Sequence, residues 1–355
     1  MAELSRRRRA AAEVMLLSRR ALCAGLAAAG LKLPGERFDA IVRRRGGTHV
    51  SLAAALADAP PGERPYRILL GRGRWQEKLV VARPNVALTG EDRRRTILTS
   101  SVAAGHARPG GGPWGTYGSA TLTVEAPGFS ARGLTFENGF DYVANLRTGA
   151  VKDAQAVALA LGNAADRTLI EDCDIIGHQD SFYLRAGRAL VSNCLIAGSI
   201  DFIFGGAAGR FERCEIRSRL RPGEALQGYV AAPSTPRAQP FGLVFDACRL
   251  TREAGVPGAS VWLGRPWRAG GNTSLLGSAV YLGCWMDAHI RPEGWTWMGY
   301  KGPAGYPMRL EAGDARFGEY ASRGPGARRA PGRPRLSHAH AAAFSRQAMF
   351  ADWRP

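Results

Sequence analysis

Lysine, long apolar runs and closely spaced cysteines are all scarce in this chain of 355 residues. Only four of its 48 basic residues are lysines, so arginine carries almost all of the net charge of +18. Beyond residue 31 there is no run of about 20 apolar residues, which argues against a membrane-spanning helix. The six cysteines form no CxxC pair and the histidines are scattered, which argues against a zinc site.

The positive charge favours polyanionic partners in general, such as nucleic acid, an acidic membrane surface or an acidic polysaccharide. The basic runs Arg6–Arg9, Arg43–Arg45 and Arg93–Arg95 are short and far apart, and no basic-aromatic nucleic-acid motif accompanies them. Alanine is abundant as well, so part of the arginine content reflects coding bias. We therefore expect solvated basic surfaces and no nucleic-acid partner.

The amino-terminal segment has the features of an export signal. Paired Arg19 and Arg20 precede Ala21–Leu31, an apolar, alanine-rich run with small residues near its end. This order resembles a secretory signal, and the arginine pair resembles a twin-arginine one. An alanine-rich amphipathic helix is the alternative. We predict a targeting segment over 1–34, a single domain over 35–355, and a secreted or periplasmic location.

A repeat of about 20 residues occupies the middle of the chain. In each copy an apolar residue leads, two or three polar or small residues follow, and then come Cys, one variable residue, and Ile or Leu. Cys173, Cys194 and Cys214 lie 21 and 20 residues apart, and Cys248 follows after a longer step, as if a loop around 219–239 were inserted. The copies are LIEDCDIIGH (169–178), LVSNCLIAGS (190–199), GRFERCEIRS (209–218), LVFDACRLT (243–251), and FSARGLTFENG (129–139) with Gly133 in the Cys position.

This period, with short alternating segments and no helical periodicity, is typical of a solenoid. It predicts an all-β fold, a right-handed parallel β-helix whose turns stack about 4.8 Å apart. The cysteines would form an inward stack. A Cys194–Cys214 disulfide and a pair of free buried thiols are both compatible with the spacing.

Both ends of the solenoid are expected to carry helices. Ser51–Asp58 predicts a short helix that caps the open amino-terminal end, and Leu336–Met349 predicts a helical tail that packs back on the barrel. The segment 321–334 is rich in Gly, Pro and Arg and predicts a loop. The first strands are expected at Phe38–Val42, Tyr66–Leu70, Lys78–Val81, Val86–Leu88 and Thr96–Leu98.

Two aspartates stand out against this fold. Asp201 lies within the apolar run of GSIDFIFGG, and Asp180 lies 21 residues earlier, in GHQDSFYL. On adjacent turns both would face one groove, where two close carboxylates cannot both ionise easily and their pKa values separate. That arrangement suits one acid and one base or nucleophile. Asp201 also needs a cationic partner, and Arg265 in LGRPW is attractive because Gly and Pro fix its backbone.

Amides and aromatic rings accompany these carboxylates. Gln155 and Gln179 could donate hydrogen bonds to an oxyanion in acyl transfer, although either alone is more simply a surface amide. The aromatic residues could stack on sugar rings; they are Phe182, Tyr183, Phe204, Trp267, Trp295, Trp297 and Tyr300. Paired carboxylates also serve glycoside cleavage, so a β-helical glycosidase and a non-catalytic polysaccharide-binding solenoid are the alternatives.

The motifs GHQDSFY, SIDFIFG and LGRPW occur in this order, with QAVAL and GRWQEKLVV upstream. Together they resemble the pectinesterases (pectin methylesterases) over about residues 38–355. GYVAAPST (228–235) and the final ADWRP look most like the secreted enzymes of Gram-negative bacteria. The resemblance implies hydrolysis of methyl esters of polygalacturonate to methanol and acidic pectin. It also implies a pectin or homogalacturonan partner, no cofactor or catalytic metal, and a monomer; an esterase acting on another ester, such as an acyl thioester, is a related possibility.

The resemblance also assigns roles to residues. It implies that Asp201 is the nucleophile, that Asp180 is the proton donor and later the base, and that Arg265 keeps Asp201 ionised. Gln155 and Gln179 correspond to the oxyanion donors. The implied substrate contacts are Thr116, Gln155, Tyr183, Phe204, Arg221, Arg265, Trp267 and Met298. The sequence departs from the family pattern at His178, where tyrosine is usual, and at Trp75, Ser181 and Phe182.

Overall fold

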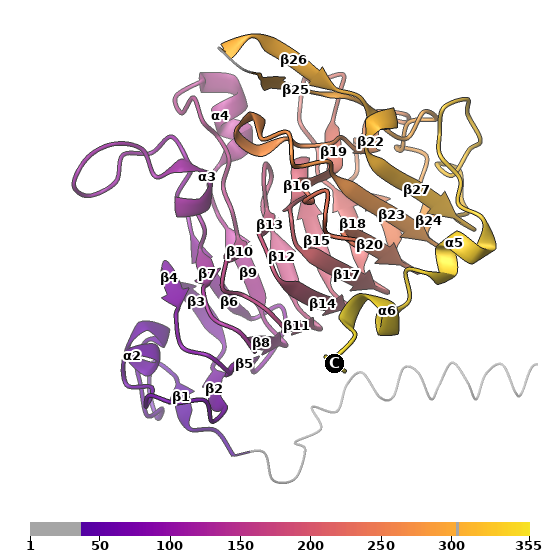
Figure 1. Ribbon diagram of the computed structural model, residues 1–355. Helices are drawn as coiled ribbons and strands as arrows, with labels where there is room; N and C mark the ends of the chain where they lie inside the picture. Colours follow the sequence, from indigo (N-terminus) through magenta and orange to yellow (C-terminus); the bar gives the residue numbers. More distant parts are fainter. Residues whose placement is uncertain (1–36, 303–304) are drawn as a thin grey trace, which may run out of the picture. The chain divides into compact units, whose positions relative to one another are not determined.

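The computed structural model describes residues 37–302 and 305–355, and the predicted targeting segment 1–34 lies outside them. Within the described residues, three long sheets of parallel strands follow one another around each turn of a solenoid (Figure 1). Their ladders hold ten, eight and seven strands. The predicted all-β parallel β-helix is confirmed.

The strands of each sheet are given in stacking order. The ten-stranded sheet holds β1 (Ala40–Val42), β2 (Tyr66–Leu70), β5 (Val86–Gly90), β8 (Ser130–Arg132), β11 (Thr168–Glu171), β14 (Arg188–Ser192), β17 (Ala208–Glu212), β20 (Leu243–Asp246), β23 (Ser278–Leu282) and β27 (Arg316–Tyr320). The eight-stranded sheet holds β3 (Gly73–Gln76), β6 (Thr96–Ser100), β9 (Thr135–Asn138), β12 (Asp174–Ile176), β15 (Leu195–Gly198), β18 (Glu215–Ser218), β21 (Arg249–Arg252) and β24 (Trp285–Met286). The seven-stranded sheet holds β4 (Leu79–Val81), β7 (Leu122–Val124), β10 (Leu159–Leu161), β13 (Phe182–Leu184), β16 (Ile200–Gly205), β19 (Gly228–Pro233) and β22 (Val261–Gly264).

The interior is filled by side chains that stack from one turn to the next. Phe211, Phe245 and Tyr281 are paired in register on β17, β20 and β23, and their rings stack with centroids 4.8 and 4.4 Å apart. All three rings are fully buried. The parallel register places equivalent positions of successive turns side by side. Apolar residues that recur at an inward position therefore stack into a continuous core.

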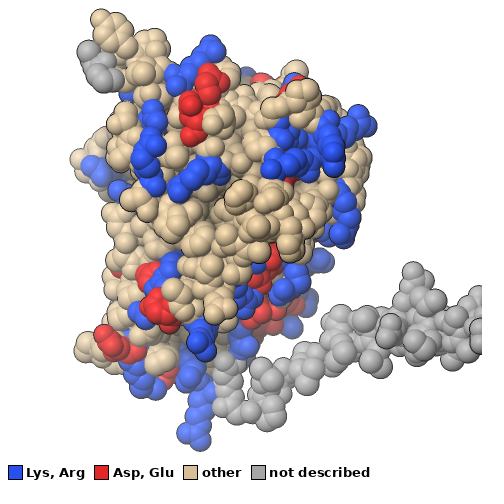
Figure 2. All heavy atoms as spheres, turned by 45° about the vertical axis from the view of Figure 1, so that its right-hand side comes forward, with Lys and Arg blue, Asp and Glu red and all other residues tan. Residues whose placement is uncertain are grey.

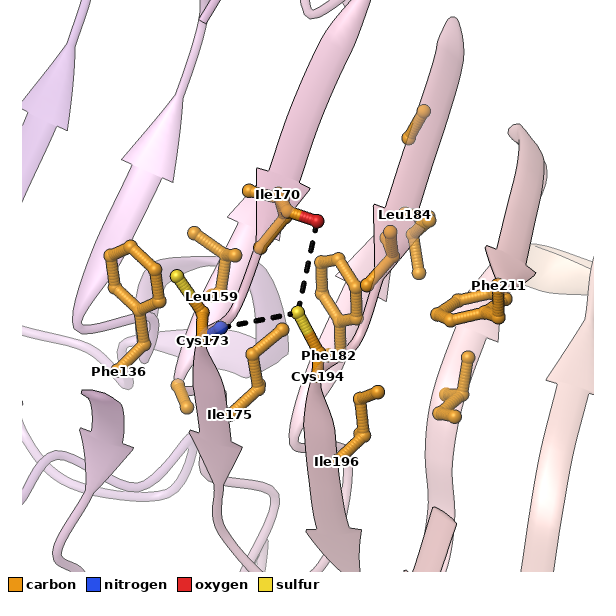
Figure 3. Packing of buried hydrophobic residues seen from close by; sticks show 14 of the residues in the cluster. Phe136, Leu159, Ile170, Cys173, Ile175, Phe182, Leu184, Cys194, Ile196 and Phe211 are labelled. Atoms are coloured by element: carbon orange, nitrogen blue, oxygen red, sulfur yellow. Dashed lines mark hydrogen bonds between the residues drawn. The ribbon is translucent and has the colours of Figure 1, made fainter. Parts of the chain in front are cut away.

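The cysteines form the predicted inward stack. Cys173, Cys194, Cys214, Cys248 and Cys284 are all buried and all free, so no Cys194–Cys214 disulfide is present. Figure 3 shows Cys194 Sγ between the backbone N–H of Cys173, which donates to it at 3.3 Å, and the carbonyl of Ile170, which accepts its thiol at 3.7 Å. The thiols of Cys194, Cys214, Cys248 and Cys284 thus pack as small apolar groups that also donate to backbone carbonyls of the previous turn, whereas that of Cys173 donates to Glu171 of its own turn.

The repeat copy around Gly133 is shifted by one residue from its predicted alignment. β8 pairs with β11 so that Arg132 lies opposite Glu171, which places Gly133 level with Asp172 and Leu134 level with Cys173. Gly133 and Asp172 have positive φ angles, 68° and 50°. The shared feature is therefore a left-handed corner residue followed by a buried side chain, and glycine occupies the corner.

The amino-terminal cap is confirmed and the carboxyl-terminal tail differs from its prediction. Helix α2 (Leu52–Ala57) begins at Ser51, whose side chain accepts from the N–H of Ala54. The tail holds two short helices, α5 (His338–Ala342) and α6 (Arg346–Phe350), instead of one helix. The break arises because Ser345 is extended and caps α6 through the N–H of Ala348.

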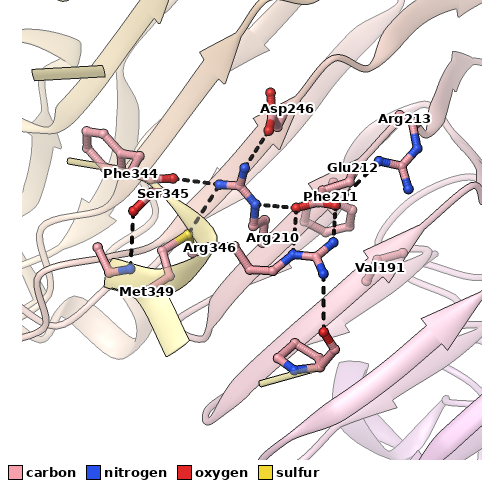
Figure 4. Close-up of polar contacts among 12 residues, drawn as sticks. Val191, Arg210, Phe211, Glu212, Arg213, Asp246, Phe344, Ser345, Arg346 and Met349 are labelled. Atoms are coloured by element: carbon pink, nitrogen blue, oxygen red, sulfur yellow. Dashed lines mark hydrogen bonds and ion pairs between the residues drawn. The ribbon is translucent and has the colours of Figure 1, made fainter. Parts of the chain in front are cut away.

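The tail is fastened to the ten-stranded sheet by buried charges (Figure 4). Arg210 on β17 donates to Glu212 at 2.7 Å and to the carbonyl of Phe344 at 2.6 Å, and it also pairs with Asp246. Arg346 of α6 pairs with the same Glu212. Because Arg210 and Glu212 are almost fully buried, this network ties the position of the tail to the sheet.

The predicted inserted loop around 219–239 is partly wrong. It contains β19, a full strand of the seven-stranded sheet, so the extra length divides between two loops on either side of that strand. The remaining elements are α3 (Gly115–Gly118), α4 (Tyr142–Thr148), the 3-10 helices η1 (Ala269–Gly271) and η3 (Ala312–Asp314), and an antiparallel hairpin of β25 (Met298–Lys301) and β26 (Pro307–Leu310).

The surface of the domain is basic in several places. Figure 2 shows Lys and Arg side chains in separate groups on the visible face, with fewer Asp and Glu among them. This distribution agrees with the scattered basic runs of the sequence. Among the described residues, no helix has the length and apolarity needed to span a membrane.

Candidate active site

The two aspartates lie on adjacent turns, as their spacing predicts. Phe182 of β13 pairs with Ile203 of β16, and the N–H of Asp180 donates to the carbonyl of Ile200 at 2.9 Å. Between its pairs with β19, β16 advances from Ile200 to Ile203 while β19 advances only from Tyr229 to Ala231. The extra residue is a β-bulge, a device that redirects a side chain, and Asp201 lies in it.

Arg265 is the partner of Asp201. Its Nε donates to one carboxylate oxygen at 2.9 Å and its Nη2 to the other at 2.6 Å, the two-point geometry that suits guanidinium and carboxylate. The guanidinium also lies 3.7 Å from the ring centroid of Tyr229, and the N–H of Arg265 donates to the carbonyl of Ala231. Arg265 is thus held from three sides in a fixed position against Asp201.

The surroundings of the two carboxyl groups give them different pKa values. Burial raises the pKa of Asp180 well above its usual range, and the nearby charge of Asp201 adds to the rise. Burial also raises the pKa of Asp201, but the attached Arg265 opposes that rise. Because only Asp201 has a direct cationic partner, the pair favours an ionised Asp201 beside a protonated Asp180.

A cavity of about 380 Å³ opens over these two residues. Ten of the eleven predicted site residues line it, and Tyr117 and Ala232 complete the lining; the predicted residues are Thr116, Gln155, Gln179, Asp180, Tyr183, Asp201, Phe204, Arg265, Trp267 and Met298. Arg221 is the exception. Its guanidinium donates to the carbonyl of Leu226 at 2.7 Å, and it is not among the lining residues.

Gln155 and Gln179 present their amides to this cavity. The side-chain oxygen of Gln155 is buried and has no hydrogen-bond partner. The backbone carbonyls of both residues are engaged, Gln155 with the N–H of Ala104 and Gln179 with the N–H of Ala156. With both backbones fixed, the N–H groups of the two side-chain amides, and not their oxygens, are the groups suited to donate to an oxygen that develops charge.

One wall of the cavity is aromatic. The rings of Tyr183 and Phe204 stack with centroids 4.3 Å apart, and Trp267 lies 5.7 Å from Phe204. Tyr117 meets the edge of Tyr183 at 5.8 Å, and its hydroxyl donates to Glu125. Sequence reasoning missed Tyr117, since α3 lies outside the repeat, and its position beside Thr116 was the available signal.

His178 is buried behind the site. Its ring stacks on Tyr142 of α4 with centroids 5.0 Å apart and an interplanar angle of 14°. Burial lowers the pKa of His178 to about 3, and Arg219 and Arg221 add to the effect. The histidine is therefore neutral at ordinary pH and acts as an aromatic support for the backbone that carries Gln179 and Asp180.

The described residues hold no cluster of three or more His, Cys, Asp or Glu side chains that could bind a metal ion. Comparison with known proteins then identifies the relatives of this site. The family model for pectinesterases matches residues 39–350. The chain belongs to the pectinesterase family. Pectinesterases are carboxylic ester hydrolases. The cavity with its two aspartates, two amides and aromatic wall therefore belongs to an esterase of this family.

Bacterial and plant members of the family are similar to this chain. Pectinesterase A of Dickeya chrysanthemi is 37% identical over 338 residues, which cover 90% of this chain and 92% of that protein. Pectinesterase/pectinesterase inhibitor 3 of Arabidopsis thaliana is 34% identical, covering 75% of this chain and 42% of that longer protein.

Solved structures agree with this relationship. A pectin methylesterase from Erwinia chrysanthemi matches with a TM-score of 0.87 and 36% identity, covering 90% of this chain and 99% of that one. A pectin methylesterase crystallised in complex with a hexasaccharide matches with the same values. The enzyme from carrot matches with a TM-score of 0.75 and 28% identity, covering 89% of this chain and 94% of that one.

Proposed function

We propose that this pectinesterase hydrolyses the methyl esters of polygalacturonate, and that Asp201 is the nucleophile and Asp180 the acid and base. The observation that carries the proposal is the asymmetry of the two buried aspartates. Arg265 donates a hydrogen bond to each carboxylate oxygen of Asp201, and Asp180 has no cationic partner of this kind. A pair with separated pKa values supplies one group that attacks and one that donates a proton.

In the first step the Asp201 carboxylate attacks the ester carbonyl carbon. The carbonyl oxygen becomes an oxyanion, to which the amides of Gln155 and Gln179 donate hydrogen bonds. The C–O bond to the methoxy group then breaks, Asp180 gives its proton to that oxygen, and methanol leaves. An acyl anhydride between the sugar carboxyl group and Asp201 remains.

In the second step a water molecule replaces methanol. Asp180, now ionised, takes a proton from the water, whose oxygen attacks the acyl carbon. The anhydride bond breaks, Asp201 returns to its carboxylate form against Arg265, and the sugar leaves as the neutral galacturonic acid group, which then loses its proton to the solvent. Asp180 is protonated again at the end, so the cycle closes without an external acid or base.

The substrate is a polymer, and the aromatic wall supports this choice. Flat rings at Tyr183, Phe204 and Trp267 offer apolar faces to sugar rings beside the reacting ester. The partner is pectin or homogalacturonan, bound by a monomer. The segment 1–34 directs export of the enzyme, and the domain 35–355 acts outside the cytoplasm, where the polymer is found.

The function is tested by measuring methanol and free acid released from highly methylated pectin. Methanol without new reducing ends is expected, whereas new reducing ends without methanol would contradict esterase action and favour a glycosidase. In the same assay Asp201→Asn should remove turnover while binding to polygalacturonate is retained. Measurable turnover well above background in that variant would exclude Asp201 as the nucleophile.

A further inference from the structure

Tyr117 of α3 extends the aromatic wall of the cavity by one ring. Ala160, Tyr183 and Phe204 occupy paired positions on β10, β13 and β16, so the outward row of the sheet carries only a methyl group on β10. Tyr117 packs against the apolar cluster that contains Ala160 and Phe204. Its ring meets that of Tyr183 edge to face, with centroids 5.8 Å apart and an interplanar angle of 86°. The ring from α3 therefore continues the wall at the turn where the strand carries a small residue.

The ring of Tyr117 is held by a charged group on either side of its own turn. Its hydroxyl donates to the carboxylate of Glu125, which follows β7 directly. The guanidinium of Arg185 lies 5.2 Å from the ring centroid. The N–H of Glu125 donates to the carbonyl of Val81 at 2.8 Å, which fixes the backbone of Glu125 to the turn before it. The carboxylate that receives the hydroxyl is thus carried by the solenoid itself.

Gly162 leaves the space in which this hydrogen bond forms. It follows β10 directly, and a Cβ atom at this position would lie 2.3 Å from the carboxyl carbon of Glu125 and 2.3 Å from the hydroxyl oxygen of Tyr117. Even alanine would therefore push the two groups apart, while the affected atoms are the free ends of side chains. Burial raises the pKa of Tyr117, and the hydrogen bond to Glu125 adds to the rise, so the hydroxyl stays protonated and remains the donor.

We propose that Glu125 positions Tyr117, and through it the ring of Tyr183, so that the aromatic wall is formed before a sugar ring binds. Glu125 is not among the residues that line the cavity, so it acts through Tyr117 and is a positioning residue. The inference rests on the proposed function, which assigns the wall to the sugar rings of the polymer. A wall that is already ordered reduces the ordering cost of binding. It holds the substrate equally in the ground state and the transition state, so its loss raises KM and leaves kcat unchanged.

The test measures kcat and KM for methanol release from highly methylated pectin. Tyr117→Phe keeps the ring and removes the donor, and Glu125→Leu removes the acceptor. Each should raise KM about fivefold with kcat nearly unchanged, the size expected for one hydrogen bond. Because both changes break the same bond, Tyr117→Phe/Glu125→Leu should also raise KM about fivefold, and not by the product of about 25-fold.

Two further variants change the same bond without removing either ring of the wall. Glu125→Gln keeps an oxygen that accepts from the hydroxyl, so its KM should stay within about twofold of that of the unaltered enzyme. Gly162→Ala places a methyl group between the partners and should raise KM as Tyr117→Phe does. Tyr66→Phe is the matched control, because the hydroxyl of Tyr66 is buried, donates to the carbonyl of Ala55 at 3.0 Å and lies outside the cavity lining. Its KM should not change.

The outcomes separate the positioning role from the proposed function. Multiplied KM effects in the double variant, a loss in kcat in place of KM, a Glu125→Gln variant as poor as Glu125→Leu, or an equal rise in Tyr66→Phe would each overturn the positioning role. Methanol release by the unaltered enzyme would still support the proposed function in all of these cases. Absence of methanol release by the unaltered enzyme would instead contradict the proposed function.

Discussion

Replacement of Arg265 by glutamine is the most direct probe of the ion pair at the site. The substitution keeps an amide that can donate one hydrogen bond to Asp201, but it removes the charge and the two-point contact at 2.9 and 2.6 Å. Asp201 is only 6% exposed, so water from the cavity replaces the lost partner only in part. The carboxylate must then either remain ionised at high cost or take up a proton.

The size of the effect follows from this geometry. An adjacent opposite charge lowers a carboxyl pKa by about 1–3 units, which is about 1.4–4 kcal/mol. Without Arg265 the pKa of Asp201 rises by that amount, because burial continues to favour the neutral form. Asp201 attacks as an anion, so activity is lost as pH falls through its pKa. The acid limb of kcat/KM should therefore move to higher pH by about 2 units.

The assay is methanol release from highly methylated pectin at a series of pH values, with kcat/KM taken at each. Arg252→Gln is the matched control, because Arg252 pairs with Asp287 at 3.0 Å and does not line the cavity. Its pH profile should match that of the unaltered enzyme. An acid limb that stays in place in Arg265→Gln would refute the view that Arg265 sets the ionisation of Asp201.

Three further changes have defined outcomes. Gln179→Met removes an oxyanion donor and should lower kcat about 10²–10³-fold in the methanol assay; a loss seen only in KM would contradict that role. Burial holds the pKa of His178 at about 3, below the usual histidine pKa of 6.5, so the unfolded chain binds more protons between these two pH values and the free energy of unfolding rises with pH there. His178→Phe keeps the aromatic stack and should flatten that slope by up to about 1.4 kcal/mol per pH unit in urea unfolding, whereas an unchanged slope would count against a neutral buried histidine. Arg210→Met leaves Glu212 buried with less compensation and should cost about 3 kcal/mol in urea unfolding. Arg210→Met/Glu212→Leu should recover most of that loss, and equal instability of both variants would contradict the charge argument.

The sequence predicted those parts of the site that follow the repeat. Asp180 and Asp201 could be placed together because one turn of the solenoid converts a separation of 21 residues into adjacency. Arg265 lies 64 residues from Asp201, outside the regular period, and its choice among many arginines depended on family resemblance. Periodicity gives neighbours between successive turns, but it does not say which loop folds over a groove.

The tail helix, whose prediction was wrong, and Arg221, whose predicted substrate contact stays a prediction, both lie where loops or caps decide the structure. Arg221 lies in the long connection before β19, and its guanidinium donates a hydrogen bond to the carbonyl of Leu226. The tail was predicted as one helix because its apolar spacing continues across Ser345, whereas the capping bond from the N–H of Ala348 starts a new helix there. Short side-chain-to-backbone bonds of this kind compete with helix continuation and leave little trace in an apolar pattern.

The backbone at the two aspartates limits which substitutions can isolate their chemistry. Asp180 and Asp201 have φ angles of 64° and 49°, in the left-handed region that asparagine and aspartate adopt more readily than other non-glycine residues. Asparagine therefore changes the charge and leaves the conformational preference in place. Alanine removes the carboxylate and also disfavours the turn that carries it, so an inactive alanine variant would report a distorted groove as readily as a missing nucleophile.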